Sequence, residues 1–222
     1  MPLFVGFSQF NGLKPKHYIH ALIEEGEHEH QDFKYQISDA KKIARSISAF
    51  ANNSGGRLLV GVKDNGHIAG VKSEEEMYMI EQAATMYCRP AQMLQFDIYK
   101  VEGKTVLLAQ VAEADSKPVQ APDESGKWRA YFRVADENVL ASGLHVKVMK
   151  HIAADEGAMV SFSAKEKELL AYLDGHGGIT LSGFSKLAHI SRFAAEEALI
   201  NLLEMKVVKL SYHNGECLIS KA

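Results

Sequence analysis

Residues 40–62 decide the fold of this chain, and they read AKKIARSISAFANNSGGRLLVGV. In the first half of this stretch, apolar residues recur every three or four positions, as one face of a helix requires: Ala40, Ile43, Ala44, Ile47, Phe50 and Ala51. The run from Leu58 to Val62 is uninterrupted and apolar, which is typical of a strand buried on both faces. Between them, Gly55 and Gly56 permit a tight reversal of the chain. The stretch therefore predicts a helix that turns directly into a central strand.

Outward from this stretch, helix and strand patterns are mixed, so we expect an α/β (α+β) domain with a mixed sheet. The spacing of apolar residues predicts helices at 15–25, 73–88 and 142–154, and strands at 31–36, 68–71, 94–101, 104–112 and 129–134. We find no internal repeat. These elements make up an expected first domain over residues 1–156.

A second, smaller domain is expected over residues 157–222, after the small and polar segment 153–158. Ser163 and Glu166 form a capping-box pattern that begins a helix ending near residue 174. Two further helices are predicted at 181–189 and 191–205. Strands at 207–212 and 216–220 follow, joined by Asn214-Gly215, a strong hairpin signal. Three helices and a hairpin predict a winged-helix domain.

Composition narrows the class of protein. The 222 residues are 46% hydrophobic and 24% charged, which is typical of a chain that buries a core. No apolar run approaches the ~20 residues of a membrane-spanning helix, and the first residues lack a signal-peptide pattern, so we expect a cytoplasmic protein. Two isolated cysteines predict no disulfide framework. The net charge of −3 argues against tight nonspecific binding of nucleic acid.

Several short motifs carry a resemblance to a known family. They are residues 22–27, 32–34, 47–56 (with the Phe-Ala-Asn-x-x-Gly-Gly block), 61–66, 68–70, 116–119 and 131–134. In this combination the chain resembles the Schlafen-type AlbA-like domain over about residues 13–142. Bacterial members, often followed by a winged helix, are usually described as DNA-binding or transcription-regulating proteins. Vertebrate members include RNA-cleaving enzymes that hold a divalent metal on acidic residues.

The resemblance implies a metal site for the enzymatic alternative. Its matching positions are Glu27, Asp32 and Asp64, with Lys34 beside them, and the implied metal is Mg²⁺ or Mn²⁺. Two features depart from that pattern: the family favours Glu where this chain has Asp32, and the five-residue step from Glu27 to Asp32 needs a turn or bulge to bring both carboxylates to one face. The simpler interpretation of these three carboxylates is a solvated acidic surface. Asp64, which precedes Asn-Gly, is also a favourable turn residue. Outside this alternative we expect no cofactor.

Two other patterns have competing interpretations. His28, His30 and Asp32 would share one face of an extended segment and could hold a metal, but we favour an exposed charged edge. The Asn52–Gly56 loop ends a helix, whereas phosphate-binding loops begin one, so we favour a purely structural turn. Asn52 and Asn53 are then expected at the rim of a groove.

Candidate nucleic-acid contacts are the basic and amide side chains of both domains: Lys34, Asn52, Asn53, Arg57, Arg129, Arg133, Arg192, Lys206 and Lys209. The third helix of the second domain presents Arg192, Glu196, Glu197, Asn201 and Glu204 at its expected outward positions. Three carboxylates there would repel phosphates.

We therefore expect a homodimeric, transcriptional-regulator-like protein that binds DNA or RNA and is not an enzyme. The alternatives are a divalent-metal-dependent ribonuclease of the Schlafen type and a non-catalytic protein-interaction module.

Overall fold

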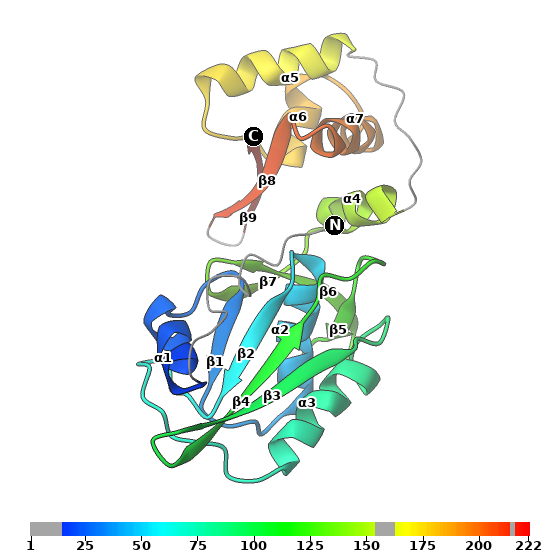
Figure 1. Ribbon diagram of the computed structural model, residues 1–222. Helices are drawn as coiled ribbons and strands as arrows, with labels where there is room; N and C mark the ends of the chain where they lie inside the picture. The colour runs from blue at the N-terminus through cyan, green and yellow to red at the C-terminus, as the bar shows by residue number, and fades with distance from the viewer. Residues whose placement is uncertain (1–14, 154–162, 214–215) are drawn as a thin grey trace. The chain divides into compact units, whose positions relative to one another are not determined.

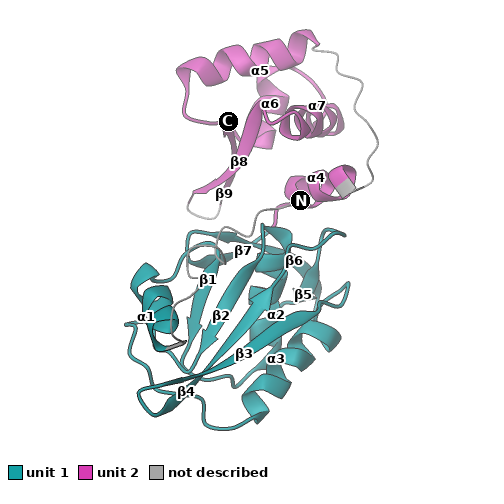
Figure 2. Ribbon diagram, viewed as in Figure 1, with its two compact units in different colours: residues 1–140 teal, residues 141–222 magenta. Residues whose placement is uncertain are grey.

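The computed structural model describes residues 15–153, 163–213 and 216–222 (Figure 1). The chain divides into a first unit, residues 1–140, and a second unit, residues 141–222 (Figure 2). The expected boundary after residue 156 lies outside the described residues and stays a prediction. Helix α4 (Gly143–Ala153), expected at the end of the first domain, belongs to the second unit.

The first unit is a mixed α+β fold, as expected. Its elements are α1 (Pro15–Glu25), β1 (Gln31–Lys34), α2 (Ala40–Asn52), β2 (Gly56–Val60), α3 (Glu75–Met86), β3 (Leu94–Val101), β4 (Lys104–Val111), β5 (Gln120–Pro122), β6 (Trp128–Val134) and β7 (Glu137–Leu140). A four-stranded sheet has the order β1-β2-β4-β3, and a three-stranded sheet has the order β5-β6-β7. Only the β1–β2 pair is parallel among these ladders, which makes the larger sheet mixed.

The larger sheet is covered on both faces. Helix α1 packs on one face, where Ile19 and Leu22 meet Phe33 and Leu59 in a common apolar cluster (Figure 1). Helices α2 and α3 pack on the other face in a second cluster that contains Phe50 and the apolar residues of β2 and β4 that point that way. Alternate residues of β2 thus enter opposite clusters, because successive side chains of a strand point to opposite faces.

From Ser46 to Asn52, helix α2 is buried all around, since it lies between the two sheets. The apolar stripe that the spacing predicted faces the larger sheet and α3, while the other side of the helix packs against β5, β6 and β7. That second buried side carries Ser46, Ser48 and Asn52, which are all nearly inaccessible to solvent. Short polar side chains suit this position, because they satisfy the backbone groups of the smaller sheet.

The turn from α2 into β2 is as tight as the two glycines predicted. Gly55 has φ +81° and donates its N–H to the carbonyl of Phe50. A Cβ placed on Gly56 would lie 2.2 Å from the ring of Phe50, so only glycine lets the strand begin against this fully buried ring.

Some predicted elements differ from the structure. Residues 68–71 are not a strand: Ile68 makes a single bridge to Val62, and Gly70 follows with φ +84°. Strand β1 ends at Lys34, two residues earlier than expected. The sequence pattern missed β5 and β7, which are only three and four residues long. Strands this short show too few alternations to be recognised.

The second unit contains α4, α5 (Ala164–Gly175), α6 (Leu181–Leu187), α7 (Arg192–Glu204), β8 (Val208–His213) and β9 (Glu216–Lys221). The capping box of Ser163 and Glu166 is confirmed at the start of α5, and Ser191 caps α7. Strands β8 and β9 pair as an antiparallel hairpin, although its Asn214-Gly215 turn lies outside the described residues. The elements from α5 to β9 follow in the expected order, and the winged-helix assignment stays a prediction.

Within the described ranges, no helix combines the length and the apolar character needed to cross a membrane. Cys88 and Cys217 are both free thiols, and burial raises the pKa of the Cys88 thiol to about 12.

Candidate functional site

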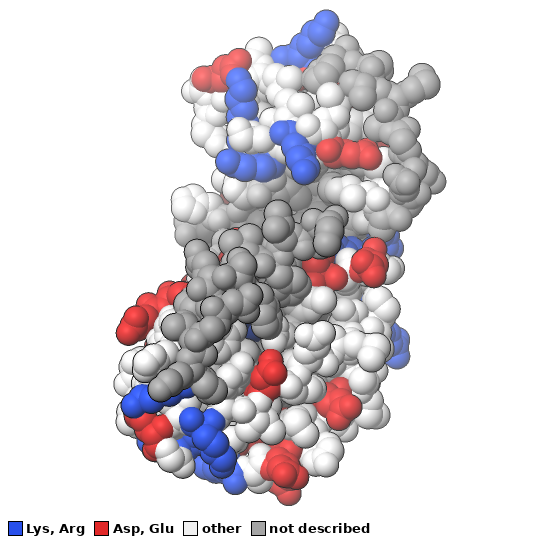
Figure 3. Space-filling view, in the orientation of Figure 1, with Lys and Arg blue, Asp and Glu red and all other residues white. Residues whose placement is uncertain are grey.

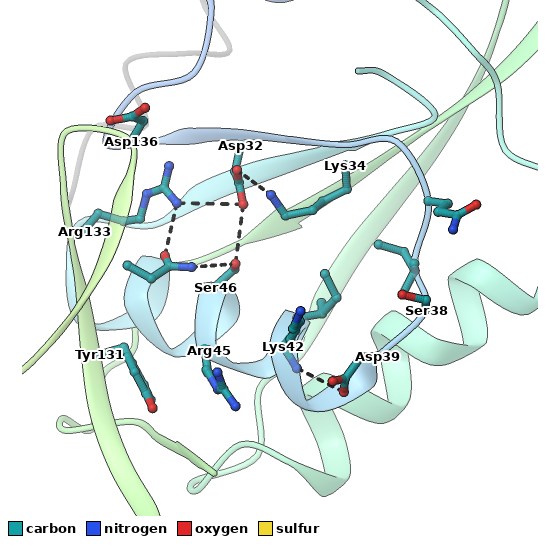
Figure 4. A pocket seen from close by; sticks show the side chains of 14 residues that line it. Asp32, Lys34, Ser38, Asp39, Lys42, Arg45, Ser46, Tyr131, Arg133 and Asp136 are labelled. Carbon is teal, nitrogen blue, oxygen red and sulfur yellow. Dashed lines mark hydrogen bonds and ion pairs between the residues drawn. The ribbon is translucent and has the colours of Figure 1, made fainter. Parts of the chain in front are cut away.

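A pocket of about 390 Å³ lies beside the first turns of α2 in the first unit (Figure 4). Two stretches far apart in the sequence line it: residues 32–46, which run from β1 through the following loop into the first half of α2, and the β6–β7 hairpin. The lining residues are Asp32, Lys34, Gln36, Ile37, Ser38, Asp39, Lys42, Ile43, Arg45, Ser46, Tyr131, Arg133, Asp136 and Asn138. Most of them are polar, which favours a polar or charged ligand.

Asp32 is the centre of a hydrogen-bonded network in the wall of this pocket (Figure 4). Its carboxylate accepts a 2.7 Å bond from Lys34 Nζ and a 3.4 Å bond from the hydroxyl of Ser46, and it lies 3.8 Å from the guanidinium of Arg133. The Asp32 side chain is only 5% exposed. Two cations and a hydroxyl therefore stabilise a carboxylate that burial alone would disfavour.

The side chain of Arg133 is buried and has a structural role. Its side chain is 1% exposed, and its guanidinium donates to Asn138 Oδ1 at 3.1 Å and to the carbonyl of His28 at 3.1 Å. The same group lies 5.0 Å from the ring centroid of Phe50. Because these contacts tie β6 and β7 to the turn before β1, Arg133 is placed to hold the pocket wall rather than to reach a ligand. This differs from the nucleic-acid contact that the sequence suggested for Arg133.

Glu27 lies next to Asp32, as the enzymatic alternative required. A tight turn between His28 and Gln31, closed by two backbone hydrogen bonds, turns the chain back so that Glu27 also accepts from the N–H of Phe33 at 2.8 Å. Burial and then a hydrogen bond with Asp32 raise the pKa of Glu27 to about 7. Two adjacent carboxyl groups therefore share this end of β1.

The structure does not bring the third acidic residue to this pair. Within the described residues, no group of three or more His, Cys, Asp or Glu side chains is placed to hold a metal ion. Asp64 is exposed in the turn after β2, and the His30 ring contacts the carbonyl of Gly55 at 3.0 Å. Neither the trio Glu27, Asp32 and Asp64 nor the set with His28 and His30 forms a metal-binding site, so the residues present do not fit the implied Mg²⁺ or Mn²⁺.

The pocket nevertheless has a cationic balance in a chain of net charge −3. Four cationic side chains line it against three carboxylates: Lys34, Lys42, Arg45 and Arg133 against Asp32, Asp39 and Asp136. Lys42 is exposed, and in the described part of the chain its ammonium group makes no ion pair. Arg45 donates to the carbonyl of Pro122 at 3.0 Å. Its guanidinium lies 3.8 Å from the carboxylate of the highly exposed Glu124, and this ion pair is weak.

The other predicted contacts of the first unit are dispersed. Asn52 is buried and bonds to Val119 and Tyr131, so it is not at a groove rim; Asn53 bonds to Glu29 and to the backbone of Arg133.

The two remaining arginines do not join the pocket. Arg57 pairs with Glu25 and Gln31 on the α1 side of the sheet, whereas Asp32 and Lys34 point to the α2 side. Arg129 is nearly half exposed and lies 3.4 Å from Asp123. Of the predicted basic contacts in this unit, the pocket collects only Lys34 and Arg133.

Lys42 and Arg45 were missed because a helical pattern alone does not show which polar positions face a cavity. A signal was present, since the two residues are three positions apart near the start of α2, where the positive end of the helix dipole lies.

On the face drawn in Figure 3, basic and acidic side chains are interspersed, with no continuous basic surface.

In the second unit, the acidic character of α7 is largely covered. Helix α4 packs on α7, and its Lys147 pairs with Glu196 while its His151 lies 3.3 Å from Glu204. Two of the three carboxylates expected to face outward are therefore turned toward α4, and Glu196 is buried.

The predicted contacts of this unit remain accessible. Arg192 is 69% exposed, although it lies 3.2 Å from Glu196, and Lys206 and Lys209 are exposed near the start of the hairpin.

The chain is similar to a known protein family and to solved structures. A family model described as Schlafen, AlbA_2 matches residues 27–142, just over half of the chain. The DIP2311 protein from Corynebacterium diphtheriae is 22% identical with a TM-score of 0.41, and the match covers 66% of this chain and 29% of that one. The N-terminal domain of a protein from Nitrosomonas europaea described as related to the DNA helicase RecG is 23% identical with a TM-score of 0.39, covering 56% and 95%. Among curated proteins no match was found.

Proposed function

This chain belongs to the Schlafen AlbA_2 family, and we propose that its first unit binds nucleic acid through the pocket beside α2. The observation that carries the proposal is the convergence of Lys34, Lys42 and Arg45 on one pocket of an otherwise acidic chain. A phosphate is the anion that such a group of cations suits, because Lys and Arg donate several charge-assisted hydrogen bonds to its oxygens. The pocket volume of about 390 Å³ is sufficient for a phosphate with its sugar.

The environment of the pocket adds to this interpretation. The first turn of α2 points its backbone N–H groups and its positive dipole end toward the loop at Ser38 and Asp39. Asp39 accepts from two of these N–H groups, so the helix terminus itself is already capped. The ligand is therefore expected to bind to the side-chain cations, with Lys42 as the principal contact.

The nuclease alternative lacks comparable support, since Asp64 does not join Glu27 and Asp32. The protein-interaction alternative was motivated by an acidic α7, and two of its carboxylates face α4 instead.

We extend the proposal to the second unit. Arg192, Lys206 and Lys209 are its expected DNA contacts, and a transcription-regulating homodimer is the assembly we propose. Substituting these three residues together should weaken DNA binding further than a first-unit variant alone, and sedimentation should give twice the 24.5 kDa chain mass.

The test is salt-dependent binding of a fluorescent oligonucleotide, DNA and RNA, measured by anisotropy. Lys42→Ala should weaken binding by about 5- to 10-fold at 0.1 M salt and reduce the salt slope by ~0.7 to 0.9, the contribution of one phosphate contact.

Lys41→Ala is the matched control, because Lys41 is the exposed neighbour on the same helix turn and does not line the pocket. It should change the affinity by less than about twofold. No binding at low salt, or equal losses in both variants, would contradict the proposed site.

A further inference from the structure

We propose that Tyr35 is a base-stacking platform beside the pocket, so that the nucleic acid bound there is single-stranded. This inference rests on the proposed function and specifies its ligand. One unpaired base would stack on the Tyr35 ring in place of an ammonium group that now lies over it. The adjoining phosphates would bind Lys63, Lys72 and the pocket cations.

The first observation is the exposure of Tyr35. It follows the last residue of β1, and it is 42% exposed while its neighbours Phe33 and Ile37 are buried on either side of it. Phe33 packs in the cluster under α1, and Ile37 packs in the cluster under α2. Tyr35 is therefore an aromatic ring left at the surface where the chain leaves the sheet.

The second observation is that two cations from separate loops gather at this ring. Lys63 Nζ lies 5.3 Å from the ring centroid, and Lys72 Nζ lies 5.7 Å from it. Both distances are within the range of a cation–π contact. Both lysines are exposed, and across the described residues neither ammonium group has a carboxylate partner.

A purely structural interpretation explains this grouping poorly. An exposed cation–π contact contributes only about 0.5–1 kcal/mol, and two ammonium groups beside one ring repel each other. A bound phosphate would relieve that repulsion. An exposed ring beside cations without a carboxylate partner suits a single strand, because every base has a stacking face and every linkage has a charge.

The platform is continuous with the pocket. Lys72 Nζ donates to Gln36 Oε1 at 3.0 Å, and Gln36 lines the pocket together with Lys34. Tyr35 stands between these two lining residues in the chain. One strand can therefore reach both the ring and the pocket cations within neighbouring nucleotides.

Stacking on Tyr35 selects against a duplex. In a duplex each base already stacks on its neighbours, and the backbone shields it from a side chain at the surface. An unpaired base has a free face. Single-stranded DNA and single-stranded RNA share this chemistry, so the test includes both.

The experiment measures the affinity of the full chain for labelled single strands of DNA and RNA and for the duplex of the same sequence. Tyr35→Ala should weaken single-strand binding by about 5- to 100-fold, the range found for removal of one stacked base. Tyr35→Phe, which keeps the ring, should stay within about twofold of the wild type.

Tyr78→Ala is the matched control, since Tyr78 is an exposed tyrosine on α3 that does not line the pocket. It should bind like the wild type, and duplex affinity should be unchanged by Tyr35→Ala.

A second measurement uses strands with one abasic nucleotide moved along the sequence. In the wild type, one position should lose affinity strongly, and in Tyr35→Ala that position should lose no more than the others. If Tyr35→Ala binds single strands like the wild type while Lys42→Ala binds them weakly, the stacking inference is wrong and the proposed function stands. If the wild type binds neither strands nor duplex, the proposed function itself is wrong.

Discussion

Replacing Asn52 with alanine should destabilise the first unit strongly while leaving its surface intact. The Asn52 amide joins α2 to the smaller sheet by three hydrogen bonds. It donates to the carbonyls of Val119 at 2.8 Å and Tyr131 at 2.7 Å, and it accepts from the N–H of Val119 at 2.7 Å. The side chain is buried, so water does not replace these partners.

The magnitude follows from what each partner loses. The Val119 N–H is left buried without an acceptor, which costs about 1–3 kcal/mol. The Val119 carbonyl still accepts from Ser48 Oγ at 2.8 Å, so this lost bond costs only about 1 kcal/mol, and we assign the Tyr131 carbonyl a similar loss. Asn52→Ala should therefore lower the free energy of unfolding by about 3–5 kcal/mol.

Urea unfolding followed by tryptophan fluorescence measures this loss, because Trp128 is the only tryptophan and lies in β6 of the first unit. Asn53→Ala is the control: its side chain is partly exposed, so its loss should be about 0.5–1.5 kcal/mol. A loss below about 1 kcal/mol for Asn52→Ala would refute the view that this amide holds the two sheets together. Selective loss of nucleic-acid binding in a stable variant would restore the functional role first expected for it.

Two further predictions concern the same unit. Because the pKa of Glu27 is raised to about 7, the folded unit retains a proton that the unfolded chain releases near pH 4.5. The stability that this proton contributes is complete below about pH 4.5 and is lost as the pH rises through 7. Glu27→Gln should remove this pH dependence of the free energy of unfolding, which is worth at most about 2 kcal/mol after solvent screening. If the urea midpoints of Glu27→Gln follow the same pH profile as those of the wild type, the prediction is wrong. Gly56→Ala should destabilise the unit by about 1–3 kcal/mol, since the new methyl group would overlap the ring of Phe50; a thermal midpoint equal to that of the wild type would show that the ring moves freely.

The sequence predicted the framework because its signals are local. The spacing of Ile43, Ile47 and Phe50 sets one face of α2, and the apolar run of β2 sets a strand buried on both faces. The two glycines between them set the turn. Each of these features acts between residues close in the chain, so periodicity reveals them.

The second buried side of α2 was not predictable in the same way. Ser48 and Asn52 are polar, and a polar face normally indicates solvent. Here that face meets β5 and β6, two strands some 70 residues away in the chain, and a single sequence does not show that pairing. For the same reason Asn52 was expected to be a ligand contact when it is a structural one.

The candidate site also combines features set by neighbouring residues with features set by the packing of distant segments. The pairing of Lys34 with Asp32 is local, because both side chains lie on one face of β1. The addition of Lys42 and Arg45, the burial of Arg133 and the separation of Asp64 all depend on how distant segments pack. Arg57 and Lys34 lie on adjacent strands, and only the register places them on opposite faces.

The proposed site is tested most directly by amide chemical shifts of the isotope-labelled chain, recorded while an unlabelled single-stranded oligonucleotide is added. We predict that the largest changes occur at the end of β1, over the first turns of α2 and in the β6–β7 hairpin. The amides of Tyr35, Lys42 and Asn138 should be among them. Changes confined to the α1 face around Arg57, or to the second unit alone, would contradict binding at this pocket.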